Sequence, residues 1–600
     1  MGRKGQNGGA IIAESLVAQG VRHLFTLCGG HISPILVESK ARGVQVVDVR
    51  DEGHAVFAAD AVARMTGIPG VAAVTAGPGV TNTVTAVKNA QMAQSPLVIL
   101  GGATATVLKG RGSLQDIDQL SLMKPVTKWA TTVKTRSALG PVMERAFATA
   151  RAGIPGPVFV EVPVDLLYDE KVVRDWYMKD AGVKDADNLG ARLLKLYLEG
   201  HLYRQFNQPY VPASAPAEKL KANLNLPSLS AVAAQLPRVP RTAAAQVKLV
   251  AQRVAQAKRP VLVIGSQALV NTPDAHRLAD AVLRLGVPTF LGGSARGLLG
   301  RRSDIQFRHH RNKALKEADL VLVAGFPFDF RLGYGMSIGR KAEVVSINLS
   351  PEELTKNRRP EIAVNMHPGE FLVRLSERVQ VSSAGIDEWT TKLRAREDER
   401  DAEIGARASA GASPVDPVHF FLRLEEKMAD DAVLIVDGGD FVATASYIVR
   451  PRAPLSWLDP GVFGTLGVGG GFAVGAGVAR PGKEIWLLYG DGSSAYSLSE
   501  FDTFARHGLA PIAVIGNDGA WAQIARDQVE ILGDDVGTVL ARTDYHAVAE
   551  GYGGKGLLLT DPDRIDATID EAKRLSREGK PVCINLHIAR SDFRKGSLSI

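Results

Sequence analysis

Two polar side chains, Asp491 and Asn517, follow two apolar runs and have the chemistry of cation ligands. The stretch LLYGDGSSAYSLSEFDTFARHGLAPIAVIGND, residues 487–518, runs a predicted strand into a Gly-Asp-Gly turn, crosses a helical segment and ends a second strand on Asn517. The carboxyl ends of such parallel strands form the edge where open α/β sheets bind ligands. A carboxylate and an amide oxygen suit Mg²⁺, and the free N–H groups of the following helix suit an anion. The stretch therefore predicts a site for Mg²⁺ and a diphosphate.

Glu52 is another carboxylate, at the start of a predicted helix of small residues in VVDVRDEGHAVFAADAVAR, residues 46–64. The helix dipole alone favours an acidic residue in the first turn. A partly buried carboxyl group also has a raised pKa and can hold a proton for transfer. The residues by themselves leave both interpretations open.

Alternating strands and helices must position these side chains, and they predict an α/β fold of three doubly wound parallel-sheet domains. We place the domains at 1–175, 246–375 and 413–600, separated by a helical insert with a Pro-rich linker, 176–245, and by a linker helix, 376–412. The helix after Gly492 is expected to span Ser493–His507. Its apolar stripe should comprise Leu498, Phe501, Phe504 and Ala505. The predicted strands are Leu24–Leu27, Val71–Val74, Leu97–Leu100, Val158–Val162, Val261–Ile264, Thr289–Leu291, Leu320–Val323, Val344–Ile347, Val433–Val436, Glu484–Leu488, Pro511–Ile515 and Val582–Leu586.

The composition excludes several classes of protein. The chain has 600 residues, 45% of them hydrophobic and 22% charged, with a net charge of +7 from scattered Lys and Arg, so nucleic acid is not an expected partner. No apolar run is long enough to span a membrane, and no signal-peptide core follows the polar start. The two cysteines, Cys28 and Cys583, form neither a disulfide framework nor a zinc motif. We expect a soluble cytoplasmic enzyme that needs no membrane.

From Gly490 to Asn517 the chain resembles the diphosphate-binding signature of thiamine-diphosphate enzymes, in which GDG is followed at about two dozen residues by Asn. The resemblance implies pyrimidine-binding, central and diphosphate-binding domains, with thiamine diphosphate and Mg²⁺ as cofactors. It implies that the metal ligands are the side chains of Asp491 and Asn517 and the backbone oxygen of Gly519. It also places Gly490, Gly492 and Ser493 against the cofactor.

Further stretches carry the same resemblance, among them TAGPGVTN at the pyrimidine end, residues 75–82. VDGGDFVATAS, residues 436–446, implies diphosphate contacts through Gly439 and Asp440. DPGVFGTLGVGGGFAVGAG, residues 459–477, resembles the segment that bends the cofactor, with Leu466 as the bulky wedge and the backbone of Gly464 and Leu466 against the pyrimidine. Glu52 is implied to hydrogen-bond the aminopyrimidine ring and supply the proton that leads to activation of thiazolium carbon C2.

Residues that would face C2 suggest the reaction. CGGHISP, residues 28–34, resembles a loop of benzaldehyde lyase and implies a catalytic His31, with Gly30 beside the cofactor. Gln115 matches an active-site Gln of acetolactate synthases and benzaldehyde lyase. Arg526 stands where acetolactate synthases carry Trp. The chain most resembles the acetolactate-synthase-like branch, or 2-hydroxyacyl-CoA lyase type 2, which implies cleavage of 2-hydroxyacyl-CoA to formyl-CoA and an aldehyde or ketone, and the reverse condensation.

Two alternatives remain from the sequence: a carboligase of acetolactate synthase or benzaldehyde lyase type that does not use CoA, and a non-catalytic regulatory homologue. The expected partners are acyl-CoA and aldehyde or ketone substrates, together with further copies of the chain in a homodimer or homotetramer. The tail ARSDFRKGSLSI is either a frayed end or a lid anchored by Phe593. Arginines of the central domain are either surface residues or contacts for CoA phosphates: Arg296, Arg301, Arg302 and Arg331.

Overall fold

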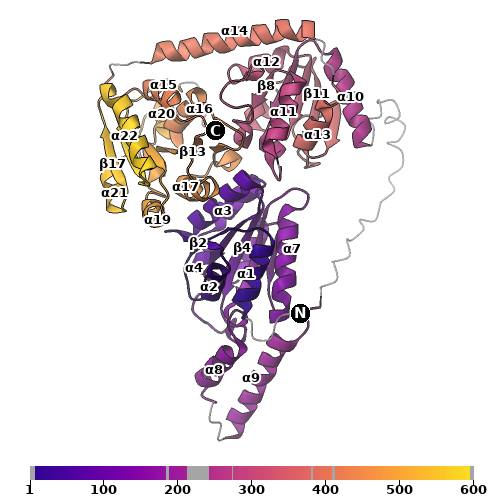
Figure 1. Cartoon of the computed structure of the whole chain (residues 1–600), viewed down its shortest axis with the longest axis vertical. Coiled ribbons are helices and arrows are strands. Elements are labelled where there is room, and N and C mark those ends of the chain that lie inside the picture. The colour runs from indigo at the N-terminus through magenta and orange to yellow at the C-terminus, as the bar shows by residue number, and fades with distance from the viewer. Residues whose placement is uncertain are drawn as a thin grey trace.

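The computed structural model describes residues 7–183, 188–211, 242–272, 274–379, 383–408 and 412–594. Most of the predicted linker, residues 212–241, and the tail beyond Arg594 lie outside the described residues. Three α/β domains lie side by side, with the first in indigo, the central one in magenta and the last in orange to yellow (Figure 1).

Each domain contains a six-stranded parallel sheet, which confirms the predicted fold class. The strand orders are β2-β1-β3-β4-β6-β5, β12-β11-β10-β7-β8-β9 and β14-β13-β15-β16-β18-β17. The strands are β1 His23–Leu27, β2 Gln45–Asp48, β3 Gly70–Val74, β4 Leu97–Ala103, β5 Trp129–Thr132, β6 Pro157–Pro163, β7 Pro260–Ile264, β8 Thr289–Leu291, β9 Gln306–Phe307, β10 Leu320–Ala324, β11 Glu343–Asn348, β12 Ile362–Asn365, β13 Val433–Asp437, β14 Trp457–Leu458, β15 Ile485–Gly490, β16 Ile512–Asn517, β17 Lys555–Leu559 and β18 Val582–His587.

Helices cover both faces of the sheets. The helices are α1 Gly8–Ala18, α2 Ser33–Ala41, α3 Glu52–Thr66, α4 Pro78–Thr81, α5 Val84–Met92, α6 Gln119–Met123, α7 Leu139–Arg151, α8 Glu170–Asp180, α9 Leu189–Asn207, α10 Ala243–Gln256, α11 Ala275–Leu285, α12 Arg311–Glu317, α13 Pro368–Ser376, α14 Ser383–Arg407, α15 Pro417–Lys427, α16 Gly439–Ile448, α17 Val468–Ala479, α18 Asp491–Ser494, α19 Glu500–Arg506, α20 Ala522–Leu532, α21 Tyr545–Gly551 and α22 Ile565–Arg577.

Helices α3 and α17 join the first domain to the third. Their small residues allow the two backbones to approach closely: a Cβ atom added at Gly475 would lie 2.3 Å from the carbonyl oxygen of Ala58, and one at Gly471 would lie 2.8 Å from that of His54. The glycines of the 459–477 stretch therefore serve helix packing as well as the loop before it. The hydrophobic core formed by these helices is continuous between the two domains.

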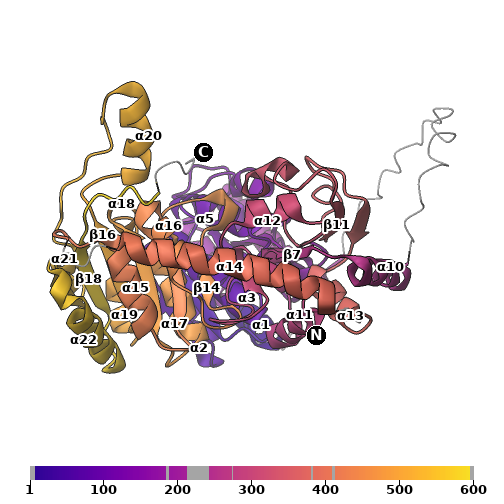
Figure 2. The ribbon, with the colours of Figure 1, turned by 90° about the horizontal axis from the view of Figure 1, so that it is seen from above.

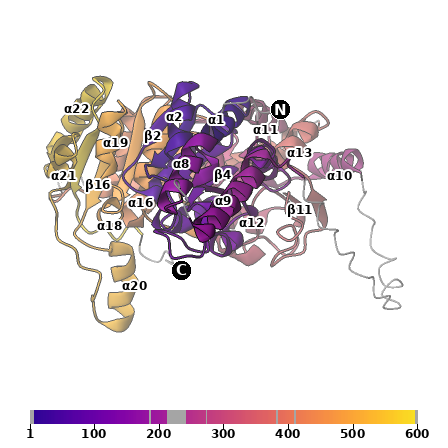
Figure 3. The same ribbon diagram turned by 90° about the horizontal axis from the view of Figure 1, so that it is seen from below.

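Two features extend from the three-domain body. Helix α14 crosses from the central domain to the third domain, as the view from above shows (Figure 2). Helices α8 and α9 form an arm on the first domain, seen from below in Figure 3. Among the residues that the structure describes, no helix combines the length and apolar character needed to cross a membrane.

The predicted helix Ser493–His507 is wrong in its extent. The chain forms a short helix α18, an irregular segment and then α19, which begins only at Glu500. Leu498, Phe501 and Phe504 are buried as predicted, but Ala505 is exposed and does not belong to the buried stripe. The side of α19 that faces the first domain instead buries Glu500.

Candidate functional site

Asp491 lies at the carboxyl end of β15 and is only 3% exposed. Its Oδ1 atom accepts a hydrogen bond from the N–H of Gly492 at 2.8 Å, and its Oδ2 atom accepts from the N–H groups of Gly519 at 2.9 Å and Ala520 at 3.2 Å. Burial raises the pKa of Asp491, although these backbone donors oppose the rise. The carboxylate is thus fixed in place without a cationic partner in contact with it among the described side chains.

Asn517 ends the neighbouring strand β16 and is fully buried. Its amide nitrogen donates to the carbonyl oxygen of Thr543 at 3.1 Å and to Oδ1 of Asn585 at 3.1 Å. These two bonds fix the amide, and its own Oδ1 atom has no hydrogen-bond partner among the described residues. A buried acceptor without a donor is costly unless something else binds it, such as a cation.

The backbone at Gly519 completes this donor set. Gly519 has a φ of +69°, and its carbonyl oxygen accepts a hydrogen bond from the N–H of Leu540 at 2.8 Å, which leaves one lone pair. A buried carboxylate, an amide oxygen without a partner and a carbonyl oxygen are the hard ligands that Mg²⁺ prefers. The residues present therefore fit a bound divalent cation.

The start of α16 lies next to this turn. Ser493 donates from its hydroxyl to the carbonyl oxygen of Asp437 at 2.5 Å, which ties the β15 turn to the end of β13. A Cβ added at Gly438 would lie 2.7 Å from Cδ2 of Leu466, so the wedge residue also reaches this point. Gly438 and Gly439 both have positive φ, which glycine adopts without strain. The N–H groups of α16 thus begin where a diphosphate is predicted to bind.

Asp440, in the first turn of α16, forms an ion pair with Arg526 of α20. Both side chains line a cavity of about 530 Å³ at the carboxyl edge of the third sheet, together with Phe441 and with tail residues from Ile588 to Asp592. The end of the described tail is held in place, because Phe593 is buried and its ring lies 6.0 Å from that of Tyr447. This cavity adjoins the predicted diphosphate residues and has the size of a small-molecule site.

Glu52 is the first residue of α3, behind the N-cap Asp51, and is 7% exposed. Its Oε2 atom accepts a hydrogen bond from Nδ2 of Asn82 at 3.0 Å, and its Oε1 atom lies on the side of Gly79. Asn82 and Gly79 belong to the TAGPGVTN stretch, so the structure brings the two predicted pyrimidine elements together. The Oε1 atom accepts no hydrogen bond from any described residue.

His31 and Gln115 lie at the same edge of the first sheet. Nδ1 of His31 is 3.2 Å from the hydroxyl of Thr75, and a Cβ added at Gly102 would lie 2.6 Å from Cβ of His31. Burial lowers the pKa of His31, so the ring is neutral near pH 7. Gln115 has a φ of +65°, and its backbone packs against Gly77. Such strain in a non-glycine residue is typical of functional loops.

Sequence reasoning missed Gln119, which holds this loop. Its Oε1 atom accepts from the N–H of Gly77 at 2.9 Å, and its Nε2 atom donates to the carbonyl oxygen of Gly102 and to Glu161. The residue is 2% exposed and all its bonds are internal. Its position in SLQDIDQ, four residues after Gln115, was the only available signal.

The remaining predicted residues are less constrained. Gly30 and Gly464 are exposed, and a Cβ at either would meet no atom within 4 Å. No described hydrogen bond connects Glu52 to Asp491, Asn517 or Leu466. The predicted pyrimidine residues Glu52 and Asn82 belong to the first domain, and the predicted diphosphate and metal residues belong to the third.

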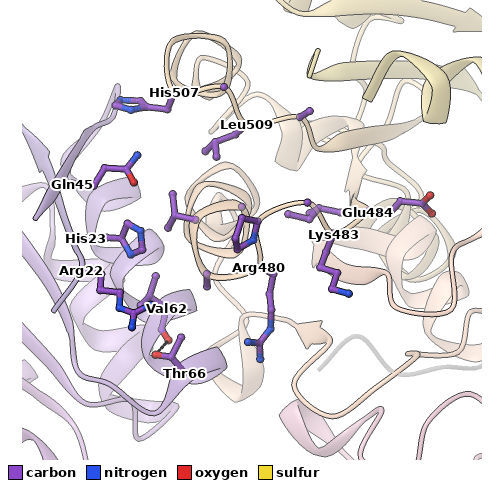
Figure 4. Close-up of a pocket in the computed structure, with 18 of the residues that line it drawn as sticks. Arg22, His23, Gln45, Val62, Thr66, Arg480, Lys483, Glu484, His507 and Leu509 are labelled. Atoms are coloured by element: carbon purple, nitrogen blue, oxygen red, sulfur yellow. Dashed lines mark hydrogen bonds between the residues drawn. The ribbon is translucent and has the colours of Figure 1, made fainter. Parts of the chain in front are cut away.

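A larger cavity, of about 1140 Å³, lies between the first and third domains but at the opposite edge of their sheets. Figure 4 shows His23, which begins β1, across from Arg480, just beyond the end of α17. None of the predicted site residues lines this cavity. Cavity size alone would therefore point to the ends of the strands opposite those that carry the predicted site residues.

The central arginines do not converge on one pocket. Arg301 pairs with Glu425 at 2.9 Å, and Arg331 pairs with Asp329 at 2.6 Å. Arg296 is half-buried, with its guanidinium over the ring of Trp457, and donates to the carbonyl oxygen of Ser446, whereas Arg302 is exposed. These four arginines therefore do not surround a single point at which the phosphates of CoA could bind.

The fold and the two groups of site residues define a class of protein. Models of the thiamine pyrophosphate (thiamine diphosphate) enzymes match the chain in three parts: the N-terminal TPP binding domain at residues 6–122, the central domain at 247–375 and the C-terminal TPP binding domain at 437–586. The chain belongs to the thiamine pyrophosphate enzyme family, as its motifs predicted, and thiamine diphosphate is the cofactor that its binding domains serve.

Individual relatives narrow this class. The chain is 45% identical to 2-hydroxyacyl-CoA lyase 2 of Danio rerio over 99% of its own length and 94% of the relative. It is 44% identical to 2-hydroxyacyl-CoA lyase 2 of Homo sapiens, with 99% and 92% covered. It is 31% identical to the acetolactate synthase large subunit IlvG of Mycobacterium tuberculosis, with 96% and 95% covered.

Proposed function

We propose that the chain is a thiamine-diphosphate-dependent carbon–carbon lyase that cleaves 2-hydroxyacyl-CoA to formyl-CoA and an aldehyde or ketone, and catalyses the reverse condensation. The observation that carries this proposal is the similarity over 99% of the chain to proteins named 2-hydroxyacyl-CoA lyase 2. The buried Glu52, Asp491 and Asn517 support an active enzyme over a non-catalytic homologue. CoA-independent carboligation is the second candidate, supported by the acetolactate synthase relative.

The cofactor would be held through the third domain. Asp491, Asn517 and the backbone oxygen of Gly519 would bind Mg²⁺, which would offset the charge of the diphosphate. Gly439, Gly490, Gly492 and Ser493 would contact the diphosphate through the turn and the start of α16, and Leu466 would press against the rings. When bound, thiamine diphosphate supplies the electron sink for cleavage of the bond next to the carbonyl carbon.

Proton transfer would rest on the first domain. Glu52 would hold at Oε1 the proton that the aminopyrimidine ring requires, because its other oxygen is engaged by Asn82. His31 is neutral near pH 7 and would take the proton of the substrate hydroxyl, with Gln115 orienting that hydroxyl. The proton lost by the hydroxyl balances the proton gained by the formyl carbon, so cleavage consumes no net proton.

Incubation with substrate tests this function. The purified holoenzyme should convert 2-hydroxyacyl-CoA to formyl-CoA and the shorter aldehyde, as followed by mass spectrometry. A free acyloin given under the same conditions should remain at least ~100-fold less reactive, because it lacks the thioester that the proposal assigns to the substrate. Conversion of the acyloin together with an inert acyl-CoA would establish the CoA-independent carboligase in its place.

We also propose that two chains form the minimum active unit. The support is that Glu52 lies in the first domain and Asp491 and Asn517 in the third, that one cofactor must touch both domains, and that no described hydrogen bond joins these residues within one chain. Sedimentation at assay concentration should give a homodimer or homotetramer, and activity per chain should fall on dilution as the assembly dissociates. Full activity in a sedimenting monomer would contradict this proposal.

A further inference from the structure

Glu500 is a buried carboxylate outside the residues assigned to the cofactor. It begins α19 in the third domain, is fully buried and directs its side chain at the first domain. Its Oε1 atom accepts a hydrogen bond from the backbone N–H of Arg50 at 2.9 Å and lies 2.7 Å from Nδ1 of His54. Its Oε2 atom has no partner among the described residues.

These two contacts fall on either side of Glu52. Arg50 lies two residues before it, in the turn that leaves β2, and His54 lies two residues after it, in the first turn of α3. One oxygen atom therefore fixes both flanks of the segment that carries the proposed proton donor. The hydrogen bond that the Glu52 side chain itself accepts comes from its own domain, from Asn82.

We propose that Glu500 and His54 are positioning residues for Glu52: the carboxylate of the third domain holds the start of α3 and thereby sets where Glu52 presents its proton. Neither residue need touch the reacting atoms. The inference concerns the family's proton transfer and does not depend on which acyl-CoA is cleaved, so it can hold if the proposed lyase activity is wrong.

Fixing both flanks matters because proton transfer is sensitive to distance. A misplacement of about 1 Å by a distant mutation can cost up to ~100-fold in rate. The first turn of a helix has few internal hydrogen bonds and opens readily. Within α3 the side chain of the N-cap Asp51 accepts from the N–H of Gly53, and its carbonyl oxygen accepts from those of His54 and Ala55. The Glu500 contacts add a restraint from outside the helix.

The charges around His54 keep the contact strong. Burial lowers the pKa of His54, but the hydrogen bond and charge of Glu500, with Asp51 and Asp437, raise it above its ordinary value. The guanidinium of Arg50 lies 3.6 Å from the carboxylate of Asp502, which is on α19 as Glu500 is. The protonated ring stabilises the contact below the ordinary histidine pKa, and this contribution is lost as the pH rises through the raised pKa.

Backbone hydrogen exchange of the cofactor-free chain tests the restraint directly. In Glu500→Ala, amides in residues 49–57 should exchange at least ~10-fold faster, while those in 58–66 stay at the wild-type rate. Glu500→Gln keeps an oxygen at the Oε1 position and should restore most of the protection. Asp502→Asn is the matched control, since Asp502 lies on the same helix and pairs with the Arg50 side chain without bonding this backbone.

Exchange of the C2 hydrogen of bound thiamine diphosphate tests the consequence. In Glu500→Ala this rate should fall at least ~10-fold, with cofactor affinity within about 3-fold of wild type. His54→Ala should also lower the rate, and His54→Asn should recover it, because Asn carries an N–H near the position of Nδ1. The His54→Ala/Glu500→Ala double variant should be no slower than Glu500→Ala alone.

Several results would overturn the proposal. Wild-type C2 exchange in folded Glu500→Ala holoenzyme excludes positioning. Faster amide exchange along the whole of α3, with equal loss of cofactor affinity, makes Glu500 a domain contact only. If Glu500→Ala does not fold, the His54→Ala and His54→Asn pair decides, and equal rates in these two variants refute the role of the contact.

Discussion

Asp491→Ala is expected to bind thiamine diphosphate at least ~100-fold more weakly than the wild-type chain in the presence of Mg²⁺, a loss of ~2.7 kcal/mol or more. The substitution removes the charged ligand that would join the cation to the protein. The other proposed ligands, Asn517 and the backbone oxygen of Gly519, are neutral and cannot offset the diphosphate. Calorimetric titration of the cofactor with and without Mg²⁺ measures the effect.

The control must separate binding from folding, because three backbone N–H groups donate to this carboxylate. Asp491→Asn retains the size of the side chain and removes its charge together with one acceptor oxygen, and circular dichroism of both variants reports the fold. Asp570→Asn alters an exposed carboxylate that pairs with Lys427 in the same domain and should bind normally. Wild-type affinity in both Asp491 variants would remove Asp491 from the metal site.

The strands for which the sequence analysis gave no bounds share one property: each lies at the edge of its sheet. They are β2 and β5, β9 and β12, and β14 and β17. Inner strands such as β10 are buried on both faces and read as continuous apolar runs. An edge strand lacks that signal; β5 is only half-buried throughout, and β14 and β9 have two residues each. Bounds could thus be predicted for the inner strands of every sheet and not for its edge strands.

The residues of the candidate site likewise fall into those that the sequence could suggest and those that it could not. Asp491, Asn517 and Glu52 could be proposed from the sequence because each stands at or just after the end of a strand, where open α/β sheets bind ligands. Glu500 could not, because its contacts with Arg50 and His54 span 450 and 446 residues of sequence. Helical spacing even assigned Glu500 to the interior of an uninterrupted helix. Only the packing of α17 on α3 brings that carboxylate to the first domain.

Glu52→Gln is expected to bind thiamine diphosphate and Mg²⁺ normally and yet activate the cofactor at least ~100-fold more slowly, in line with the 10²–10⁴-fold contribution of general acid–base catalysis. Glutamine keeps an oxygen that can accept from Asn82, so α3 should remain in place. It has no acidic proton to give to the aminopyrimidine ring. Exchange of the C2 hydrogen for deuterium in the bound cofactor, stopped with acid and read by NMR, gives the rate.

Glu52→Gln and Asp491→Ala should be defective in different steps. Comparing them is the sharpest test that the first domain activates the cofactor and the third domain binds it. Loss of Asp491 should weaken binding of the cofactor, whereas loss of the Glu52 proton should leave binding intact and slow only the activation of the bound cofactor. Glu144→Gln, an exposed change in α7, provides the matched control. If Glu52→Gln exchanges C2 hydrogen at the wild-type rate, Glu52 is an ordinary first-turn carboxylate favoured by the helix dipole. The role proposed for Glu500 would then have no proton donor to position, although its effect on amide exchange at the start of α3 should still be measurable.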